Sequence, residues 1–295
     1  MTGAAQAAML TDGRRLHLWH GPIDLIVEAF GAPAEVRAAY GQARAAFADL
    51  LATLVAELDG LRRPVGATPP RFDGPVARRM AAAVWPHRAV FVTPMAAVAG
   101  AVADEILHAL TRGRDLERAY VNDGGDIALH LGPGTKFDAG IVHRLDAPRL
   151  DAVATIYDTM PVRGVATSGR GGRSLSLGIA DAVTVLAHDA AAADAAATLI
   201  ANAVNVDHPA IVRRPACEID ESSDLGDRPV TVAVGTLGPA AVAAALAAGT
   251  AAAQDMRRRG VIEGAVLALK GEIRVVGPRR MIADNRPGRA AGVAA

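Results

Sequence analysis

The sequence predicts an α+β fold, built mainly from antiparallel sheets and long alanine-rich helices. Segments with strand character follow one another in adjacent pairs, whereas a parallel sheet would need a crossover helix after each strand. Long helical segments separate these groups of strands, and 51% of the 295 residues are hydrophobic against 21% charged. This composition supplies a large core and is not typical of a disordered chain. No linker is long or polar enough to mark a boundary, so we expect a single domain over residues 1–295.

The N-terminal part is expected to form a hairpin and two helices. Gly21-Pro22 divides two apolar-rich runs, which is typical of a β-hairpin. Farther along, apolar residues recur every three to four positions, as they do on the buried face of a helix. Thr93 and Pro94 suit the cap and the first turn of a second helix. The expected elements are a hairpin, a helix, a loop, a short strand and a helix, at residues 14–29, 34–61, 62–75, 89–92 and 93–110.

The C-terminal part is expected to be richer in strands. Strands should flank a turn at residues 122–126, and a hairpin should form around Lys270-Gly271. A strand enters an alanine-rich helix twice, at residues 90–110 and 183–204, which leaves an internal duplication into two similar halves open. The other expected elements are strands at 138–144, 151–157, 161–166, 182–187 and 230–234, helices at 190–204 and 239–259, and an irregular segment at 211–228.

Charge and cysteine content exclude several classes of protein. Lysine and arginine total 31, aspartate and glutamate also total 31, and the formal net charge is therefore zero. Bulk electrostatics would then hold neither a nucleic acid nor an anionic membrane. The single cysteine, Cys217, excludes a disulfide scaffold and a cysteine-based metal cluster.

Targeting signals are weak in this sequence. The N-terminus has no basic region of the kind that begins a signal peptide. Residues 229–254 carry no charge and are long enough to resemble a membrane span, but Gly238-Pro239 divides them. A strand followed by a helix fits this run better. We therefore expect a cytoplasmic protein without a membrane partner.

The first candidate site segment is Val-Asn-Asp-Gly-Gly-Asp at residues 121–126. Gly124 and Gly125 permit positive φ and let the backbone approach a ligand closely, and Asp126 follows them directly. The alternative is a plain hairpin turn, which Asn, Asp and Gly all favour.

The second candidate segment, residues 164–174, is rich in glycine and contains two arginines. Successive backbone N–H groups in such a loop can bind a diphosphate, and arginine adds bidentate contacts to phosphate. The GxxxxGK[ST] spacing of a P-loop is absent, and a surface loop is the alternative. The candidate ligand-binding residues here are Thr167, Ser168, Gly169, Arg170 and Arg173.

The third candidate segment is an alanine-rich helix that carries Asp194 and Thr198. Residues four apart lie on one face of a helix, so this pair offers two hard oxygen ligands. Such ligands suit Mg²⁺, which takes few protein ligands and completes its shell with water or phosphate. The alternative is an aspartate favoured by the helix dipole in the first turn, beside a threonine that merely packs.

Three motifs in this order resemble the ApbE-like superfamily of FAD:protein FMN transferases. They are GGD at residues 124–126, ATSG at 166–169 and ADAAAT at 193–198, against the GG[DE], ATSG and ADALAT of the superfamily. The sequence is most similar to a little-characterised subfamily in which GVATSG is followed by SxSxGxADAVTVLA and then ADAAAT. The resemblance implies an ApbE-like, T-fold-like architecture.

The resemblance also implies a function and a set of site residues. Mg²⁺ would be bound by Asp194, Thr198 and the backbone carbonyl of Ala96, and the diphosphate of FAD would lie against the metal. Gly124, Gly125 and residues 166–174 would border the nucleotide. The reaction would be a phosphoryl transfer that moves FMN to an acceptor protein, in which the metal neutralises negative charge.

Two departures from the superfamily pattern keep other functions open. Ala99 stands where the transferases carry the lysine of AKG. Residues 174–181 lack the histidine and the Pro-Thr-Gly of the HHIxDPxTG segment. One alternative is a non-catalytic or accessory protein, in line with relatives connected with sulfur assimilation and homocysteine formation. Another is a homo-oligomeric scaffold in which alanine-rich helices pack across subunits.

Overall fold

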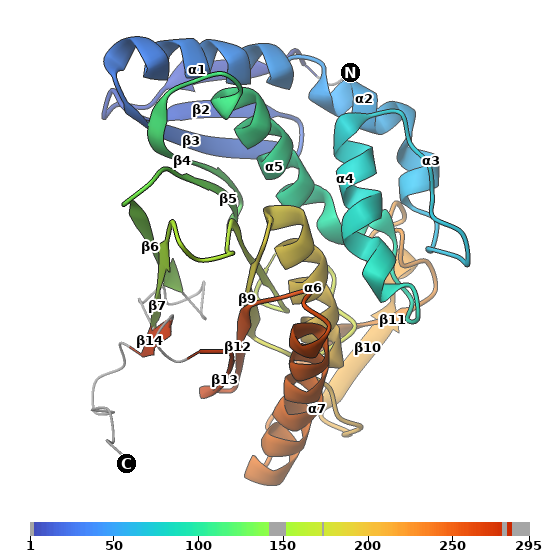
Figure 1. Ribbon diagram of the computed structural model, residues 1–295. Helices are drawn as coiled ribbons and strands as arrows, with labels where there is room; N and C mark the ends of the chain where they lie inside the picture. Colours follow the sequence, from blue (N-terminus) through green and yellow to red (C-terminus); the bar gives the residue numbers. More distant parts are fainter. Residues whose placement is uncertain (1–2, 142–151, 173, 279–281, 285–295) are drawn as a thin grey trace, which may run out of the picture.

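The computed structural model describes residues 3–141, 152–172, 174–278 and 282–284. A large antiparallel sheet forms its centre (Figure 1). Helices cover one face of this sheet, and a small three-stranded sheet lies on the other side. The predicted α+β class with mainly antiparallel sheets is therefore confirmed.

The large sheet has nine strands, and each neighbouring pair is antiparallel. β5 pairs with β8 because β6 and β7 leave the sheet and form a separate layer. The strands in spatial order are β1 (Gln6–Met9), β2 (Leu16–His20), β3 (Ile23–Gly31), β4 (Leu116–Asp123), β5 (Asp126–Leu131), β8 (Gly164–Ser168), β9 (Ala182–Ala187), β12 (Gly264–Leu269) and β13 (Glu272–Val276).

Two smaller sheets complete the strands. β6 (Lys136–Ile141), β7 (Ala152–Tyr157) and β14 (Ile282–Asp284) form the three-stranded sheet. β10 (Ile211–Pro215) and β11 (Pro229–Val234) form a two-stranded ribbon. The expectation of an irregular segment at residues 211–228 is wrong for its first five residues, because β10 pairs antiparallel with β11 there.

The helices differ from expectation in the N-terminal part. The single helix expected over residues 34–61 is three helices, and the strand expected at 89–92 does not form. α4 begins at Pro75, inside the expected loop, and proline at the first helical position is itself a helix-start signal that this expectation overlooked. The helices are α1 (Pro33–Phe47), α2 (Leu50–Ala56), α3 (Leu58–Leu61), α4 (Pro75–Val84), α5 (Val98–Thr111), α6 (Ala190–Ala203) and α7 (Pro239–Arg258), with short 3-10 turns η1 (Trp85–His87), η2 (Pro94–Ala97) and η3 (Ala216–Glu218).

Two apolar cores lie on the two faces of the large sheet. α1, α5, α6 and α7 pack in turn along one face, from β3 at one end to β12 at the other (Figure 1). The second core joins β5, β8, β9 and β12 to the three-stranded sheet. All six residues of β9 are buried, because this strand is covered on both faces. α6 is therefore held deep in the molecule, and its alanines let neighbouring elements approach closely.

The uncharged run at residues 229–254 forms β11 and most of α7, as expected. Within the described parts of the chain, none of the helices combines the length and the apolar character that a bilayer span requires.

Candidate functional site

Helices α5 and α6 supply each other with hydrogen-bond acceptors where their N-terminal ends meet. Asp104 on α5 accepts the backbone N–H groups of Ala190 and Ala191 on α6, at 3.1 and 2.8 Å. In return, Asp194 on α6 accepts the N–H of Gly100 on α5, at 3.1 Å. The first N–H groups of a helix have no acceptor within that helix. Each carboxylate therefore accepts hydrogen bonds from N–H groups that the neighbouring helix cannot satisfy by itself. We call this arrangement the reciprocal cap.

The reciprocal cap requires the two backbones to lie unusually close. A Cβ atom added at Gly100 would lie 2.2 Å from the carbonyl oxygen of Ala190, a distance that no side chain tolerates. Asp189 is the N-cap residue of α6 and accepts the N–H of Ala192 at 2.7 Å. Asp194 therefore lies in the second turn of α6, so the dipole of its own first turn does not explain its presence.

A cavity of about 410 Å³ opens beside the reciprocal cap. Asp194 and Thr198 line it from α6, and Ala96 lines it from η2. Asp126, at the start of β5, lines the same cavity. The structure thus brings together the candidate metal residues and one candidate residue of the glycine-rich turn.

Carboxylates dominate the charge around this cavity. Asp126, Asp194, Asp220 and Asp224 line it, and Arg62 is the one cationic side chain among the described residues that do so. Burial, and then the charges of Asp126 and Asp123, raise the pKa of Asp194 well above its ordinary value. The cavity therefore favours a cation, because a bound cation relieves the repulsion among these carboxylates.

The end of β8 is tied to this cavity through its backbone and one hydroxyl. Asp126 Oδ1 accepts the N–H of Thr167 at 3.1 Å, and the Thr198 hydroxyl donates to Ser168 Oγ at 3.4 Å. The Thr167 hydroxyl instead pairs with that of Thr184 on β9, at 2.9 Å. Because side chains alternate along a strand, Thr167 and Ser168 face opposite sides of the sheet. Ser168 is thus the member of this pair whose side chain reaches α6.

The glycine pair forms the hairpin turn between β4 and β5. Gly124 and Gly125 have φ of 61° and 115°, and the strands pair up to Asp123 opposite Asp126. Asn122 Oδ1 accepts the N–H of Gly125 at 2.8 Å. Neither glycine is among the described residues that line the cavity. Their contribution to the site is to place Asp123 and Asp126 next to each other, near Asp194.

The glycine- and arginine-rich loop that follows β8 turns toward β9. The guanidinium of Arg170 pairs with Asp181 at 3.1 Å, and the N–H of Arg170 donates to the carbonyl of Ala180. Gly169, with φ of 141°, lies close to the backbone of Asp181. Neither Arg170 nor Gly169 is among the described residues that line the cavity. Arg173 lies outside the described residues.

Residues 216–228, part of the segment expected to be irregular, form one wall of the cavity. Asp220 and Asp224 line the cavity, and the hydroxyl of Thr93 donates a hydrogen bond to Asp224. The guanidinium of Arg228 stacks over the ring of Phe91 at 3.4 Å. These contacts tie residues 216–228 to the start of η2, across more than a hundred residues of sequence. No local pattern in the sequence signals such a contact.

Gly100 and Asp104 are the other residues whose roles were missed. Gly100 directly follows Ala99, which stands at the lysine of the AKG motif, and Asp104 lies four residues farther along the same helix. This motif was therefore the available signal for both residues. The structure assigns them the close contact and the acceptor of the reciprocal cap.

The donor set of the cavity suits a small hard cation. Asp194 and Thr198 offer a carboxylate and a hydroxyl, and the Ala96 backbone lies across the same cavity. Among the described residues, there is no group of three or more histidine, cysteine, aspartate or glutamate side chains that could hold a metal ion. A set with one carboxylate and neutral oxygens matches Mg²⁺, which keeps several waters and binds phosphate oxygens.

Fold, motif order and this oxygen-lined cavity together define an ApbE-like protein. The chain belongs to the ApbE-like family, because the family model described as "AbpE bacteria" matches residues 7–275. The resemblance found in the sequence motifs is therefore confirmed.

Relatives of similar sequence carry the name UPF0280 protein. The protein from Methanothrix thermoacetophila is 36% identical over 134 residues, which cover 45% of this chain and 54% of the relative. The protein from Methanopyrus kandleri is 36% identical over 160 residues, which cover 53% of this chain and 61% of the relative. The chain thus spans about half the length of the relatives it matches.

Two solved structures were also compared with the chain. The flavin transferase ApbE from Vibrio cholerae has 11% sequence identity and a TM-score of 0.47, over 92% of this chain and 96% of that one. The flavinyl transferase ApbE from Pseudomonas stutzeri has 12% identity and a TM-score of 0.42, over 93% and 94%.

Proposed function

We propose that the cavity beside the reciprocal cap binds Mg²⁺ and, through it, the diphosphate of FAD, and that the protein transfers FMN to an acceptor protein. The observation that carries this proposal is that Asp194, Thr198 and Ala96 line one cavity together with Asp126. Membership of the ApbE-like family supports the same reading.

The charges of the cavity support a role for the metal. Asp126 and Asp194 would repel a free diphosphate, so the nucleotide needs a cation between itself and these carboxylates. Asp194, Thr198 and the carbonyl of Ala96 would hold that cation. When bound, it supplies charge neutralisation of the diphosphate during phosphoryl transfer.

The chain's own residues would orient the nucleotide from two sides. Asp126 fixes the end of β8 through the N–H of Thr167, and Thr198 contacts Ser168. Both contacts hold the end of β8 beside the cavity, where Ser168 and Gly169 would border the diphosphate. The backbone N–H groups of residues 170–172 already donate to carbonyl groups of the protein.

A second candidate function is binding without transfer. Ala99 and Ser174, which stand at the two departures from the transferase pattern, both line the cavity. No histidine or lysine occurs among the described residues that line it. A wall without a histidine or lysine to act as acid or base favours an accessory, non-catalytic member of the family, for which sulfur metabolism is the proposed setting.

The first experiment measures thermal unfolding of the full chain with FAD, in millimolar Mg²⁺ or in EDTA. We expect FAD to raise the Tm only with Mg²⁺, by an amount equivalent to about 2.7 kcal/mol when FAD is a hundredfold above its Kd. Asp194→Asn should abolish this shift, whereas Asp59→Asn, an exposed carboxylate on α3, should retain it. A well-folded protein with no FAD-linked shift would overturn the proposal.

The second experiment separates the two candidate functions. The protein is incubated with FAD, Mg²⁺ and a flavin-accepting domain, and covalent FMN is detected by in-gel fluorescence. Labelled acceptor supports transfer and excludes the accessory reading. An FAD-linked shift in Tm without labelling supports binding alone.

A further inference from the structure

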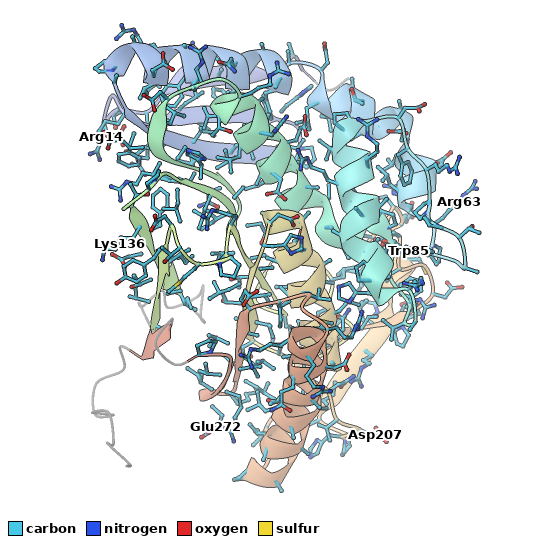
Figure 2. The ribbon with its side chains drawn as sticks, viewed as in Figure 1. Arg14, Arg63, Trp85, Lys136, Asp207 and Glu272 are labelled. Atoms are coloured by element: carbon cyan, nitrogen blue, oxygen red, sulfur yellow. The ribbon has the colours of Figure 1, made fainter. Side chains whose placement is uncertain are left out.

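A second and larger cavity, of about 1040 Å³, lies at the N-terminal end of α6. It is formed by α4 and η1, by the junction of β9 with α6, and by the end of α7. Trp85, which follows α4 directly, stands on its wall (Figure 2). The proposed function does not use this cavity, which we call the arginine cavity.

Three arginines from separate segments line the arginine cavity. Arg79 comes from α4, Arg88 follows η1, and Arg259 caps the end of α7. Arg259 is engaged on two sides, because it pairs with Asp255 at 3.3 Å and donates to the carbonyl of Pro86. The other two arginines keep donors free. Arg79 uses its Nε for Glu105, at 2.8 Å, and Arg88 uses one terminal nitrogen for the carbonyl of Trp85, at 3.1 Å. A guanidinium carries five N–H donors, so both retain several for a ligand.

The charge of Arg88 is not neutralised by the protein. In the part of the chain that the structure describes, no carboxylate lies within ion-pair distance of it. Its guanidinium stacks on the ring of Trp85 at 4.5 Å, which fixes the group without balancing its charge.

The two carboxylates on the wall, Asp104 and Asp189, have their oxygens engaged by neighbouring groups. Both oxygens of Asp104 accept N–H groups of α6 in the reciprocal cap. Asp189 accepts the N–H of Ala192 with one oxygen and contacts His188 with the other, at 3.1 Å. Glu105 and Asp255 pair with Arg79 and Arg259, so Arg88 is the arginine of this wall whose charge most directly attracts an anion.

We propose that the arginine cavity binds the phosphate group of a small organic molecule. Guanidinium groups from three segments can each meet a different oxygen of a phosphate monoester, whereas one fork suffices for a planar carboxylate. Ala82, Ala83 and Val261 supply an apolar wall for the organic part. The volume is of the order found for small-molecule sites, which reach about 1000 Å³.

The test is calorimetric titration of the full chain with phenyl phosphate, inorganic phosphate and acetate, at constant ionic strength. EDTA is present throughout, so that a metal at the Asp194 cavity cannot contribute. We expect saturable binding of phenyl phosphate, weaker binding of inorganic phosphate and none of acetate. Arg88→Gln should weaken phenyl phosphate binding by about tenfold, the amount typical of one charge-assisted contact.

Three further variants make the result specific. Arg37→Gln removes the same charge from an exposed position on α1 and should leave binding unchanged. Asp59→Asn, at an exposed position on α3, should also leave it unchanged. Arg79→Gln should weaken binding as Arg88→Gln does. Because Arg79 also pairs with Glu105, the Tm of the Arg79→Gln variant is compared with that of the wild type. If this variant unfolds, the result for the exposed Arg88 decides the test.

Several outcomes would overturn the proposal. Absence of saturable binding at millimolar phenyl phosphate would do so, as would equal binding of acetate. An equal loss in Arg37→Gln and Arg88→Gln would show that the protein's overall charge, and not the arginine cavity, attracts the ligand.

Discussion

The carboxylate of Asp194 accepts the backbone N–H of Gly100 at 3.1 Å and thereby caps a helix other than its own. The same side chain lines the cavity with Asp126. One residue thus serves both the packing of α5 on α6 and the proposed cation site. Its raised pKa reflects the cost of this position, since the charge is buried beside other carboxylates.

Mg²⁺ binding at Asp194 should weaken as the pH falls. The protonated carboxyl is a poor metal ligand, and the raised pKa brings protonation closer to neutrality than for an ordinary aspartate. We therefore expect the Mg²⁺-linked rise in Tm to decrease as the pH is lowered from 8, and to be absent in Asp194→Asn. The measurement is a series of thermal melts with and without Mg²⁺ at each pH. A shift that is independent of pH, or that survives in Asp194→Asn, contradicts the proposed ligand.

Asp104 should make the folded state less stable as the pH rises from about 4 to 6. Burial is the main cause that raises the pKa of Asp104 from 3.8 to about 6. The folded state then binds more protons than the unfolded state in this window, so the free energy of unfolding falls with pH, by up to about 3 kcal/mol in total. Asp104→Asn should flatten this part of the profile in urea titrations. Asp59→Asn, which alters an exposed carboxyl, should leave it as in the wild type.

Gly100→Ala should destabilise the protein by about 3 kcal/mol, at the upper end for overpacking, because its Cβ would meet the Ala190 carbonyl at 2.2 Å. Gly41→Ala on α1 is the matched control. Nothing lies within 4 Å of a Cβ at Gly41, so alanine should stabilise that helix by about 0.5–1 kcal/mol. Urea unfolding of both variants checks the pair. Equal effects in the two helices would contradict the close contact at the reciprocal cap.

Thr93→Val should loosen the wall formed by residues 216–228. The substitution removes the hydroxyl that donates to Asp224 and should cost about 1 kcal/mol. We expect faster hydrogen exchange in residues 216–228 and a lower Tm. Thr53→Val on α2, which loses only a local bond to the Asp49 carbonyl, should leave exchange in that segment unchanged. Unchanged exchange in Thr93→Val would show that other contacts hold the wall.

The fold class could be predicted because paired strands and alanine-rich helices are local patterns. The break of the helix at Ala48 and the pairing of β10 with β11 could not be predicted in this way. The start of α4 at Pro75 was overlooked. Helix breaks and ribbons of this kind depend on which surfaces meet in three dimensions. The single domain over residues 1–295, the internal duplication and the homo-oligomer stay predictions.

For the candidate site, the spacing of Asp194 and Thr198 predicted a cation-binding pair, and the family resemblance implied the carbonyl of Ala96. The structure places all three residues on one cavity. The glycine pair and Arg170 show the limit of such reasoning. A loop rich in glycine and arginine has the composition of a phosphate site, but only the fold determines that Arg170 pairs with Asp181. Their direct contact with a nucleotide stays a prediction.

The order of strands has a consequence for the chain as it leaves the ribosome. β5 lies in the middle of the finished sheet, but its second edge stays unpaired until β8 has been synthesised. Asp104 likewise lacks its donors until α6 follows. A nascent polypeptide that ends before β8 therefore exposes an open strand edge, which promotes aggregation. Completion of the sheet and the packing of α5 on α6 thus protect the nascent chain from association with other chains.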